Sequence, residues 1–182
     1  MPAEEITDET IMERVRQGEL SELSELFERY HVKLYNFFLK LTGDRQVSED
    51  LTQNLFYRVI RYRQSFDQRQ GSFRSWVYQT ARNIHNDHLK EQKKSAGHNK
   101  PFLEDHLQVA EPQSGYQEEH FDKLNFALSQ LKADQRELLL LSRFEGLKYE
   151  EISRLNGKSV LAIRVMVHRA IQNLKTIYFN QP

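Results

Sequence analysis

Two long stretches of this chain are free of proline, so few positions force a helix to end. The 182 residues carry proline only at positions 2, 101, 112 and 182. Proline removes a backbone donor and clashes with the preceding helical turn, so its absence permits long helices. Glycines at positions 18, 43, 71, 97, 115, 146 and 157 lie close to the ends of apolar patterns with spacings of three and four. Because no useful length alternates with period two, we predict an all-α fold.

The helical patterns fall into two groups separated by a stretch without periodicity. The first group predicts helices over about 8–17, 21–42, 48–62 and 72–89, and the second over about 118–131, 134–144, 149–155 and 159–178. The stretch between them contains two prolines and is acidic from position 101 onward. We therefore predict two small helical domains joined by a flexible linker: an N-terminal domain over 1–92, an acidic linker over 93–117 and a C-terminal domain over 118–182.

Polar residues mark the expected starts of several helices. Thr7 or Asp8 is the expected N-cap of the first helix, and Ser48 is the expected cap of the third, because short polar side chains accept hydrogen bonds from the first free amides. Asp134, with Glu137 three residues later, predicts a start that resembles a capping box.

The formal net charge is zero, but the charges alternate along the chain. Residues 1–28 sum to −7, residues 29–100 to +8, residues 101–151 to −6 and residues 152–182 to +5. Two basic blocks indicate two places where a polyanion could bind, although helical proteins often have uneven surfaces.

The C-terminal pattern predicts a helix-turn-helix. A short helix with Glu151, Ile152 and Leu155 facing inward is followed by a turn over 156–158 and a final helix. In that motif the second helix lies in the major groove of DNA. The expected inward residues of the final helix are Ile163, Val167, Ile171 and Leu174, and the expected polar contacts are Lys158, Ser159, Arg164, His168 and Arg169. A helical hairpin with a solvated basic face is the alternative.

The end of the N-terminal group interleaves aromatic and basic side chains. These residues are Phe66, Arg69, Phe73, Arg74, Trp76, Tyr78, Arg82 and Asn83. Rings that stack on unpaired bases and cations that neutralise the backbone together bind single-stranded nucleic acid. Some of the rings must also build the core, so packing is an equal explanation for part of this set.

The sequence offers no enzyme-like or metal-binding pattern. The absence of cysteine excludes disulfides, thiolate ligands and a cysteine nucleophile. The stretch before Ser159 resembles the end of a phosphate-binding loop, but Ile152 stands where the first glycine is required. His85 and His88 lie one turn apart without a third ligand. We predict no enzyme activity, no metal and no cofactor.

The hydropathy pattern predicts a cytoplasmic protein without membrane insertion. No apolar run approaches the roughly 18 residues that span a bilayer. The first residues are acidic and lack the basic and then apolar order of a secretory signal.

Three stretches of the chain, in order, match the motifs of one known protein family. Residues 49–56, EDLTQNLF, are similar to the family's Glu-Asp-Leu-x-Gln-x-x-Phe. Residues 73–83, FRSWVYQTARN, are similar to its Phe-x-x-Trp-Leu-x-x-Ile-Ala-Arg-Asn, and Asp87 matches a following Asp. Residues 131–174 resemble its C-terminal helix-turn-helix domain. Together the three stretches resemble the sigma factors of bacterial RNA polymerase, in particular the extracytoplasmic-function (ECF) group, and the resemblance covers about residues 20–176.

The resemblance implies an alternative-type sigma factor that binds core RNA polymerase, mainly at the β′ clamp, and directs it to promoter DNA. The implied polymerase-binding residues are Glu49, Asp50, Leu51, Gln53, Asn54 and Phe56. The implied −10 residues are Arg69, Phe73, Arg74, Trp76, Tyr78, Arg82, Asn83 and Asn86. The implied −35 residues are Lys158, Ser159, Arg164, His168 and Arg169. The family also implies a linker near the polymerase active centre, an anti-sigma factor as a partner, and a monomer when free.

The final helix departs from the family pattern at three positions. Leu161, Ala162 and Met166 stand where the family favours Gly, Thr and Arg. The changes at positions 162 and 166 remove two polar groups from the reading surface, so the strength or the sequence preference of the −35 contact is expected to differ.

Two other functions fit parts of the sequence. A stand-alone helix-turn-helix regulator would bind duplex DNA without polymerase and use the N-terminal unit as a sensor or dimerisation domain. A helical adaptor would bind only protein and would show no salt-dependent binding of nucleic acid.

Overall fold

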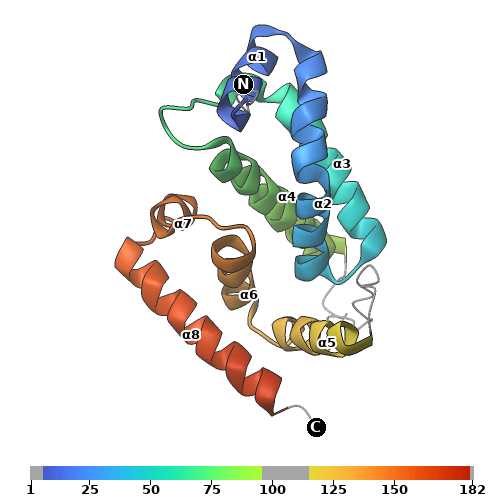
Figure 1. Cartoon of the computed structure of the whole chain (residues 1–182), viewed down its shortest axis with the longest axis vertical. Coiled ribbons are helices and arrows are strands. Elements are labelled where there is room, and N and C mark those ends of the chain that lie inside the picture. The colour runs from blue at the N-terminus through green and yellow to red at the C-terminus, as the bar shows by residue number, and fades with distance from the viewer. Residues whose placement is uncertain (1–5, 96–114, 181–182) are drawn as a thin grey trace, which may run out of the picture. The chain divides into compact units, whose positions relative to one another are not determined.

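The computed structural model describes residues 6–95 and 115–180, which form helices joined by short turns (Figure 1). No strand occurs in these two ranges, and the prediction of an all-α fold with two helical domains is confirmed. Most of the predicted linker, over 93–117, lies outside the described residues. None of the helices in the described ranges is both long and apolar enough to cross a membrane.

The Cα positions divide the described chain into two compact units. The first holds residues 6–36 and 48–95, and the second holds residues 37–47 and 115–180. This division differs from the predicted domains in residues 37–47, and the domain limits stay a prediction.

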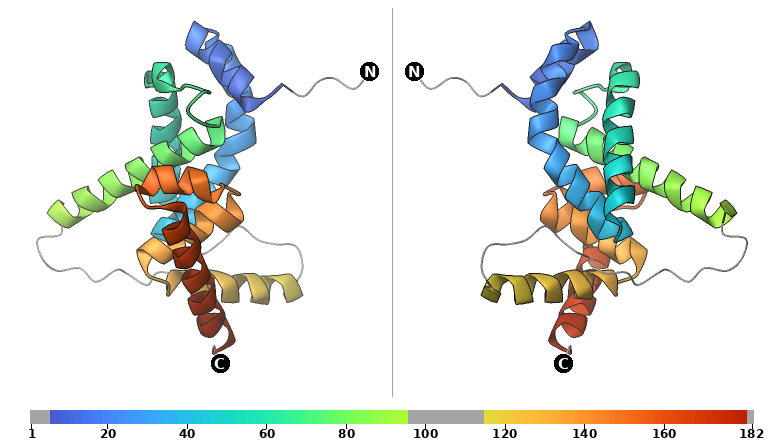
Figure 2. Two further views of the ribbon diagram at one scale, coloured as in Figure 1. Left: turned by 90° about the vertical axis from the view of Figure 1, so that its left-hand side faces the viewer. Right: turned by 90° about the vertical axis from the view of Figure 1, so that its right-hand side faces the viewer.

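The first four α-helices follow the predicted order (blue to green in Figures 1 and 2). The elements are α1 (Asp8–Gln17), η1 (Leu20–Glu22), α2 (Leu23–Thr42), α3 (Arg45–Arg61), η2 (Arg63–Ser65) and α4 (Phe73–Ser95). The start of α1 is as predicted, because the Thr7 hydroxyl accepts from the Thr10 amide at 3.3 Å. Gly18 ends α1 with a φ of 106°, a left-handed conformation that glycine adopts without steric cost.

The predicted cap of the third helix is wrong. The helix α3 begins at Arg45, and the Val47 amide donates to Asp44 Oδ1 at 2.9 Å. Ser48 is instead fully buried in the first turn of α3, where its carbonyl accepts from the Thr52 hydroxyl at 2.7 Å. Asp44 directly follows the turn at Gly43 (φ 72°), so it reaches the free amides before Ser48 can.

The core of the first unit is built from one face of each helix. Its fully buried side chains include Ile11, Met12 and Val15 of α1, Leu26 and Leu34 of α2, Leu55 and Val59 of α3, and Phe73, Val77, Ala81 and Ile84 of α4. Each large side chain in such a core contributes about 1.5–3 kcal/mol relative to an exposed one. Because these residues are spaced three and four apart, they share one face of each helix, and the burial of these faces holds the helices together.

The second group of helices begins at α5 (Gly115–Ser129). It continues with α6 (Ala133–Leu139), the π-helical segment η3 (Leu140–Phe144), α7 (Tyr149–Asn156) and α8 (Val160–Phe179). Contacts of α8 with α5, α6 and α7 organise this unit (yellow to red in Figure 2). Residues 138–141, four consecutive leucines, are all buried, which is typical of a helix covered on every side.

The predicted capping residue of α6 is also wrong. The helix begins at Ala133 after Lys132, and no side chain caps its start. Asp134 therefore lies inside the first turn, where its negative charge still favours the free amide end of the helix.

Arg136 connects α6 to the end of α5. Its residue exposure is only 7%, and burial lowers the pKa of its guanidinium. Its Nε donates to the Leu128 carbonyl at 2.9 Å, and its Nη2 donates to the carbonyls of Ser129 and Leu131. Leu128 and Ser129 end α5 and Leu131 follows it. The Leu131 amide also donates to the Leu128 carbonyl at 3.2 Å, and the guanidinium supplies the further donors at this helix end, where carbonyls run out of helical partners.

We expect Arg136→Ala to lower the free energy of unfolding by about 2–3 kcal/mol, because buried carbonyls lose a charged donor. Urea denaturation followed by circular dichroism measures the change. Arg136→Lys, which keeps the charge but not the fork of donors, should lose less. An Arg136→Ala chain as stable as the wild type would show that the guanidinium does not stabilise the end of α5.

Candidate nucleic-acid interface

The helix-turn-helix is formed by α7 and α8. The Lys148 amide donates to Glu151 Oε2 at 2.8 Å at the start of α7, and Gly157, with a φ of 65°, ends that helix. The Ser159 hydroxyl then accepts from the Ala162 amide at 3.2 Å and caps α8. Ile152 is buried on α7, so the two helices are held at the predicted turn by packing and by local caps.

The five predicted DNA-contacting residues of this motif are all exposed. They are Lys158, Ser159, Arg164, His168 and Arg169. Of the residues predicted to face inward, Ile163 and Val167 are fully buried, whereas Ile171 and Leu174 are half-buried. The Ser159 hydroxyl already caps the helix, so the four basic side chains are the groups free to contact DNA.

Two apolar residues on α8 are exposed beside these basic groups. Leu161 is 68% exposed and Val165 is 41% exposed. Sequence reasoning noted Leu161 only as a departure from a family pattern and missed Val165. The spacing of four residues between them was the available signal, because it places both on one face of a helix.

The predicted polymerase-binding residues on α3 fall into two classes. Four are exposed: Glu49, Asp50, Gln53 and Asn54. Leu51 and Phe56 are each only 7% exposed, and the Phe56 ring packs against Phe27 with centroids 4.7 Å apart. The exposed face continues to Tyr57, which is 58% exposed and was not predicted. The polar members can therefore meet a partner, and the two apolar members fix the position of the helix.

The aromatic and basic segment divides between core and surface. Phe66, Phe73 and Tyr78 are at most 1% exposed and cannot stack on a base in this conformation, so core packing accounts for them. Trp76 is half-buried, and the centroid of its ring lies 5.7 Å from that of Phe66 and 6.0 Å from that of Phe73. The remaining polar members are exposed (Arg69, Arg74 and Asn83) or half-buried (Arg82 and Asn86).

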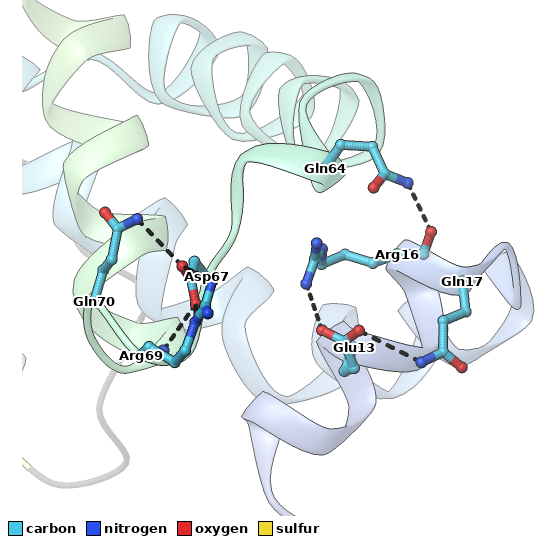
Figure 3. A network of polar contacts seen from close by, with 7 residues as sticks. All are labelled: Glu13, Arg16, Gln17, Gln64, Asp67, Arg69 and Gln70. Carbon is cyan, nitrogen blue, oxygen red and sulfur yellow. Dashed lines mark hydrogen bonds and ion pairs between the residues drawn. The ribbon is translucent and has the colours of Figure 1, made fainter.

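A network of polar contacts shapes the loop before α4 (Figure 3). Asp67 accepts from Arg69 Nε and Nη2, both at 2.9 Å, and from the Arg69 amide at 3.0 Å. These hydrogen bonds hold the pKa of the Asp67 carboxyl far below its usual range. The Arg69 side chain is nevertheless 86% exposed, so it is oriented by Asp67 and remains accessible.

The start of α4 is held by Glu9 of α1 and by Ser72, the residue that directly precedes α4. Glu9 Oε1 accepts from the Phe73 amide at 2.9 Å, and the Ser72 hydroxyl accepts from the Ser75 amide at 3.1 Å. Asp8 accepts from the Tyr30 hydroxyl and pairs with Arg29 at 2.7 Å. Burial and the hydrogen bond to Asp8 raise the pKa of Tyr30, so this hydroxyl stays a donor.

Within residues 6–95 and 115–180, no three His, Asp or Glu side chains are grouped so that they could hold a metal ion. The arrangement instead offers exposed cations near a half-buried indole in one unit and a basic recognition helix in the other. These groups can bind nucleic acid.

Comparisons with known proteins agree with a nucleic-acid-binding role for these groups. Residues 26–95 match the family model for sigma-70 region 2, and residues 121–174 match the model for sigma-70 region 4. The chain is 32% identical over 171 residues to the RNA polymerase sigma factor CarQ of Myxococcus xanthus, an alignment that covers 91% of this chain and 94% of CarQ. It is 29% identical over 156 residues to the ECF sigma factor SigM of Bacillus subtilis, with 86% and 94% covered.

Two solved structures have the same fold. The sigma factor RpoE of Bartonella quintana, in complex with the anti-sigma factor NepR, aligns with a TM-score of 0.75 at 22% identity, covering 88% of this chain and 99% of that one. CnrH, in complex with the cytosolic domain of CnrY, aligns with a TM-score of 0.71 at 17% identity, covering 96% and 99%. With both sigma-70 regions matched in order and with these relatives, the chain belongs to the ECF group of the sigma-70 family, and it is an alternative sigma factor that directs transcription initiation.

Proposed function

We propose that this sigma factor binds core RNA polymerase through the exposed face of α3, contacts the −10 strand near the start of α4, and reads the −35 duplex with α8. The observation that carries the proposal is that both sigma-70 regions match in order, at residues 26–95 and 121–174. A stand-alone regulator needs only the second region.

The docking surface in this proposal consists of Glu49, Asp50, Gln53 and Asn54. Two carboxylates and two amides on one exposed helix face suit a partner surface that is basic and rich in hydrogen-bond donors. Leu51 and Phe56 act through packing, because they hold α3 against the rest of its unit. The expected partner surface is the β′ clamp.

For the −10 strand, the exposed part of Trp76 offers a ring for an unpaired base. Phe66 and Phe73 support the indole from the core side, so it loses little freedom when a base stacks on it. Arg69 and Arg74 are exposed near the same end of α4 and can neutralise phosphates. Stacking contributes about 1–3 kcal/mol per base, which offsets part of the cost of unpairing the duplex.

For the −35 duplex, the first turns of α8 enter the major groove. Lys158 and Arg164 lie at that end of the helix, and His168 and Arg169 follow one turn later, all of them exposed. The polymerase carries out the chemistry, and we expect no catalysis by this chain; sigma factors as a family are not enzymes. We expect the protein to act in the cytoplasm with the polymerase and to be restrained by an anti-sigma factor.

Replacing Asp50 by Ala should weaken the binding of core polymerase by about tenfold or more, because the docking face loses a charged contact. Co-elution with bacterial core polymerase on a sizing column measures the effect, and circular dichroism checks the fold. Asp122→Ala, an exposed acid on α5, is the matched control. An Asp50→Ala chain that co-elutes like the wild type would remove this docking surface.

Replacing Arg69 by Ala should return the pKa of Asp67 towards its usual range, since the lowering comes from hydrogen bonds with Arg69. The pairing stabilises the loop at pH values above the ordinary carboxyl pKa, and this contribution is lost as the pH falls through the lowered pKa. Carboxyl carbon NMR shifts followed against pH measure it. Arg74→Ala should leave the Asp67 titration unchanged, and an unchanged titration in Arg69→Ala would rule out the pairing.

Replacing Arg164 by Ala should weaken binding of the upstream duplex by about 1–3 kcal/mol if the guanidinium contacts a base edge. If the guanidinium contacts a phosphate instead, the salt slope, which is the slope of log affinity against log salt concentration, should fall in magnitude by about 1. The measurement is binding of the polymerase complex to a promoter duplex found by run-off transcription, over a series of salt concentrations. Lys175→Ala, near the other end of α8, serves as control. Equal affinity and equal slope would count against α8 as the reading helix.

A further inference from the structure

The exposed apolar pair at the start of α8 has no role in the core. Leu161 and Val165 are 68% and 41% exposed, while Ile163, Val167 and Ala170 form the buried side of the same helix. Leu161, Val165 and His168 are spaced i, i+4 and i+7, so they share one face of α8. The pair therefore lies in the turns of a recognition helix that face base edges.

The charge around this pair favours DNA as its occupant. Arg164 and Arg169 flank the face, and both are exposed. Residues 152–182 contain five Lys or Arg and no Asp or Glu. An exposed apolar pair near the start of a helix whose charged residues are all basic is complementary to a polyanion that presents apolar groups between its charges.

Only one apolar group projects from base edges in the major groove, the C5 methyl of thymine. Leucine and valine have no donor or acceptor, so they leave the amino groups of adenine and cytosine without a partner when they face them. We propose that Leu161 and Val165 each contact a thymine methyl, so that the −35 element of this sigma factor contains two thymines at defined positions. The inference rests on the proposed function of α8.

The helix geometry restricts where those thymines lie. Four residues of an α-helix span about 6 Å. Successive bases of one strand are about 3.4 Å apart along the duplex. The two thymines are therefore no more than about two base-pair steps apart, and the flanking cations supply affinity without choosing the base.

Replacing single thymines by uracil removes the methyl group and nothing else. Duplexes bound by the full-length chain with bacterial core polymerase are first selected from a random-sequence pool. Each thymine in the upstream element of a selected duplex is then replaced by uracil, and affinities are compared at one salt concentration. Two replacements should each weaken binding by about three- to fivefold, the effect of exposing one buried methyl group.

Variants assign each methyl to a side chain. Leu161→Ala should abolish the difference between thymine and uracil at one position, and Val165→Ala should abolish it at the other. Alanine favours an exposed helix, so both variants should stay folded. Phe179→Ala removes an equally apolar side chain, 75% exposed at the far end of α8, and should keep both differences. None of the three should change the salt slope, because no phosphate contact is lost.

Each result bears on a separate claim. Equal affinity of the wild type for thymine and uracil duplexes would overturn the inference, leave the proposed function intact, and assign the apolar pair to a protein partner. Differences that persist in both Leu161→Ala and Val165→Ala would overturn it as well. A polymerase complex that selects no duplex would remove the proposed function of α8 and this inference together.

Discussion

The start of α4 depends on a carboxylate that another helix supplies. The first amides of any helix lack partners within it, and here Glu9 of α1 accepts from the Phe73 amide while Ser72 serves Ser75. The neighbouring Asp8 accepts from Tyr30 and pairs with Arg29, which attaches α1 to α2 at the same time. Removing α1 would leave the Phe73 amide and the Tyr30 hydroxyl without these acceptors, whereas Ser72 would still accept from the Ser75 amide. The position of α4 is therefore a tertiary property and is not a consequence of helix propensity alone.

This constraint explains why the aromatic residues at the beginning of α4 divide as they do. Phe73 is buried at the capped end of α4. Its ring meets that of Tyr30 edge-on, with centroids 5.2 Å apart, and packs near Phe66 with centroids 6.1 Å apart. Trp76 lies one turn further, at the border of this cluster, and is half-buried. A side chain that is supported on one side and open on the other can stack on a base with little loss of entropy. In the proposed −10 contact, the buried rings would hold the half-buried indole in place.

Local signals predicted the parts of the fold that local chemistry decides. Thr7, Gly18, Gly157 and Ser159 occur where the structure starts or ends helices, because caps and left-handed turns need only nearby residues. Ser48 was predicted as the cap of the third helix, but it is buried, and Asp44 accepts from the Val47 amide in its place. In the candidate site, the sequence identified the exposed cations, but spacing alone could not separate Phe73 and Tyr78 from Trp76. For Phe73 the deciding contacts are with Glu9 of α1 and Tyr30 of α2, which lie far away in the sequence.

In α8 the groups expected to supply affinity for DNA differ from those expected to supply sequence specificity, and the charge of the helix alone does not reveal this. Contacts between cations and phosphates weaken with salt and are nearly independent of sequence, so the basic residues of α8 would hold any duplex. Discrimination between DNA sequences needs side chains that contact base edges and that bind the wrong bases poorly. In many recognition helices polar side chains have this role, but the exposed face at the start of α8 holds Leu161 and Val165. A helix built this way reads DNA mainly by what it excludes, because an amino group that faces an aliphatic side chain loses its water and gains no partner.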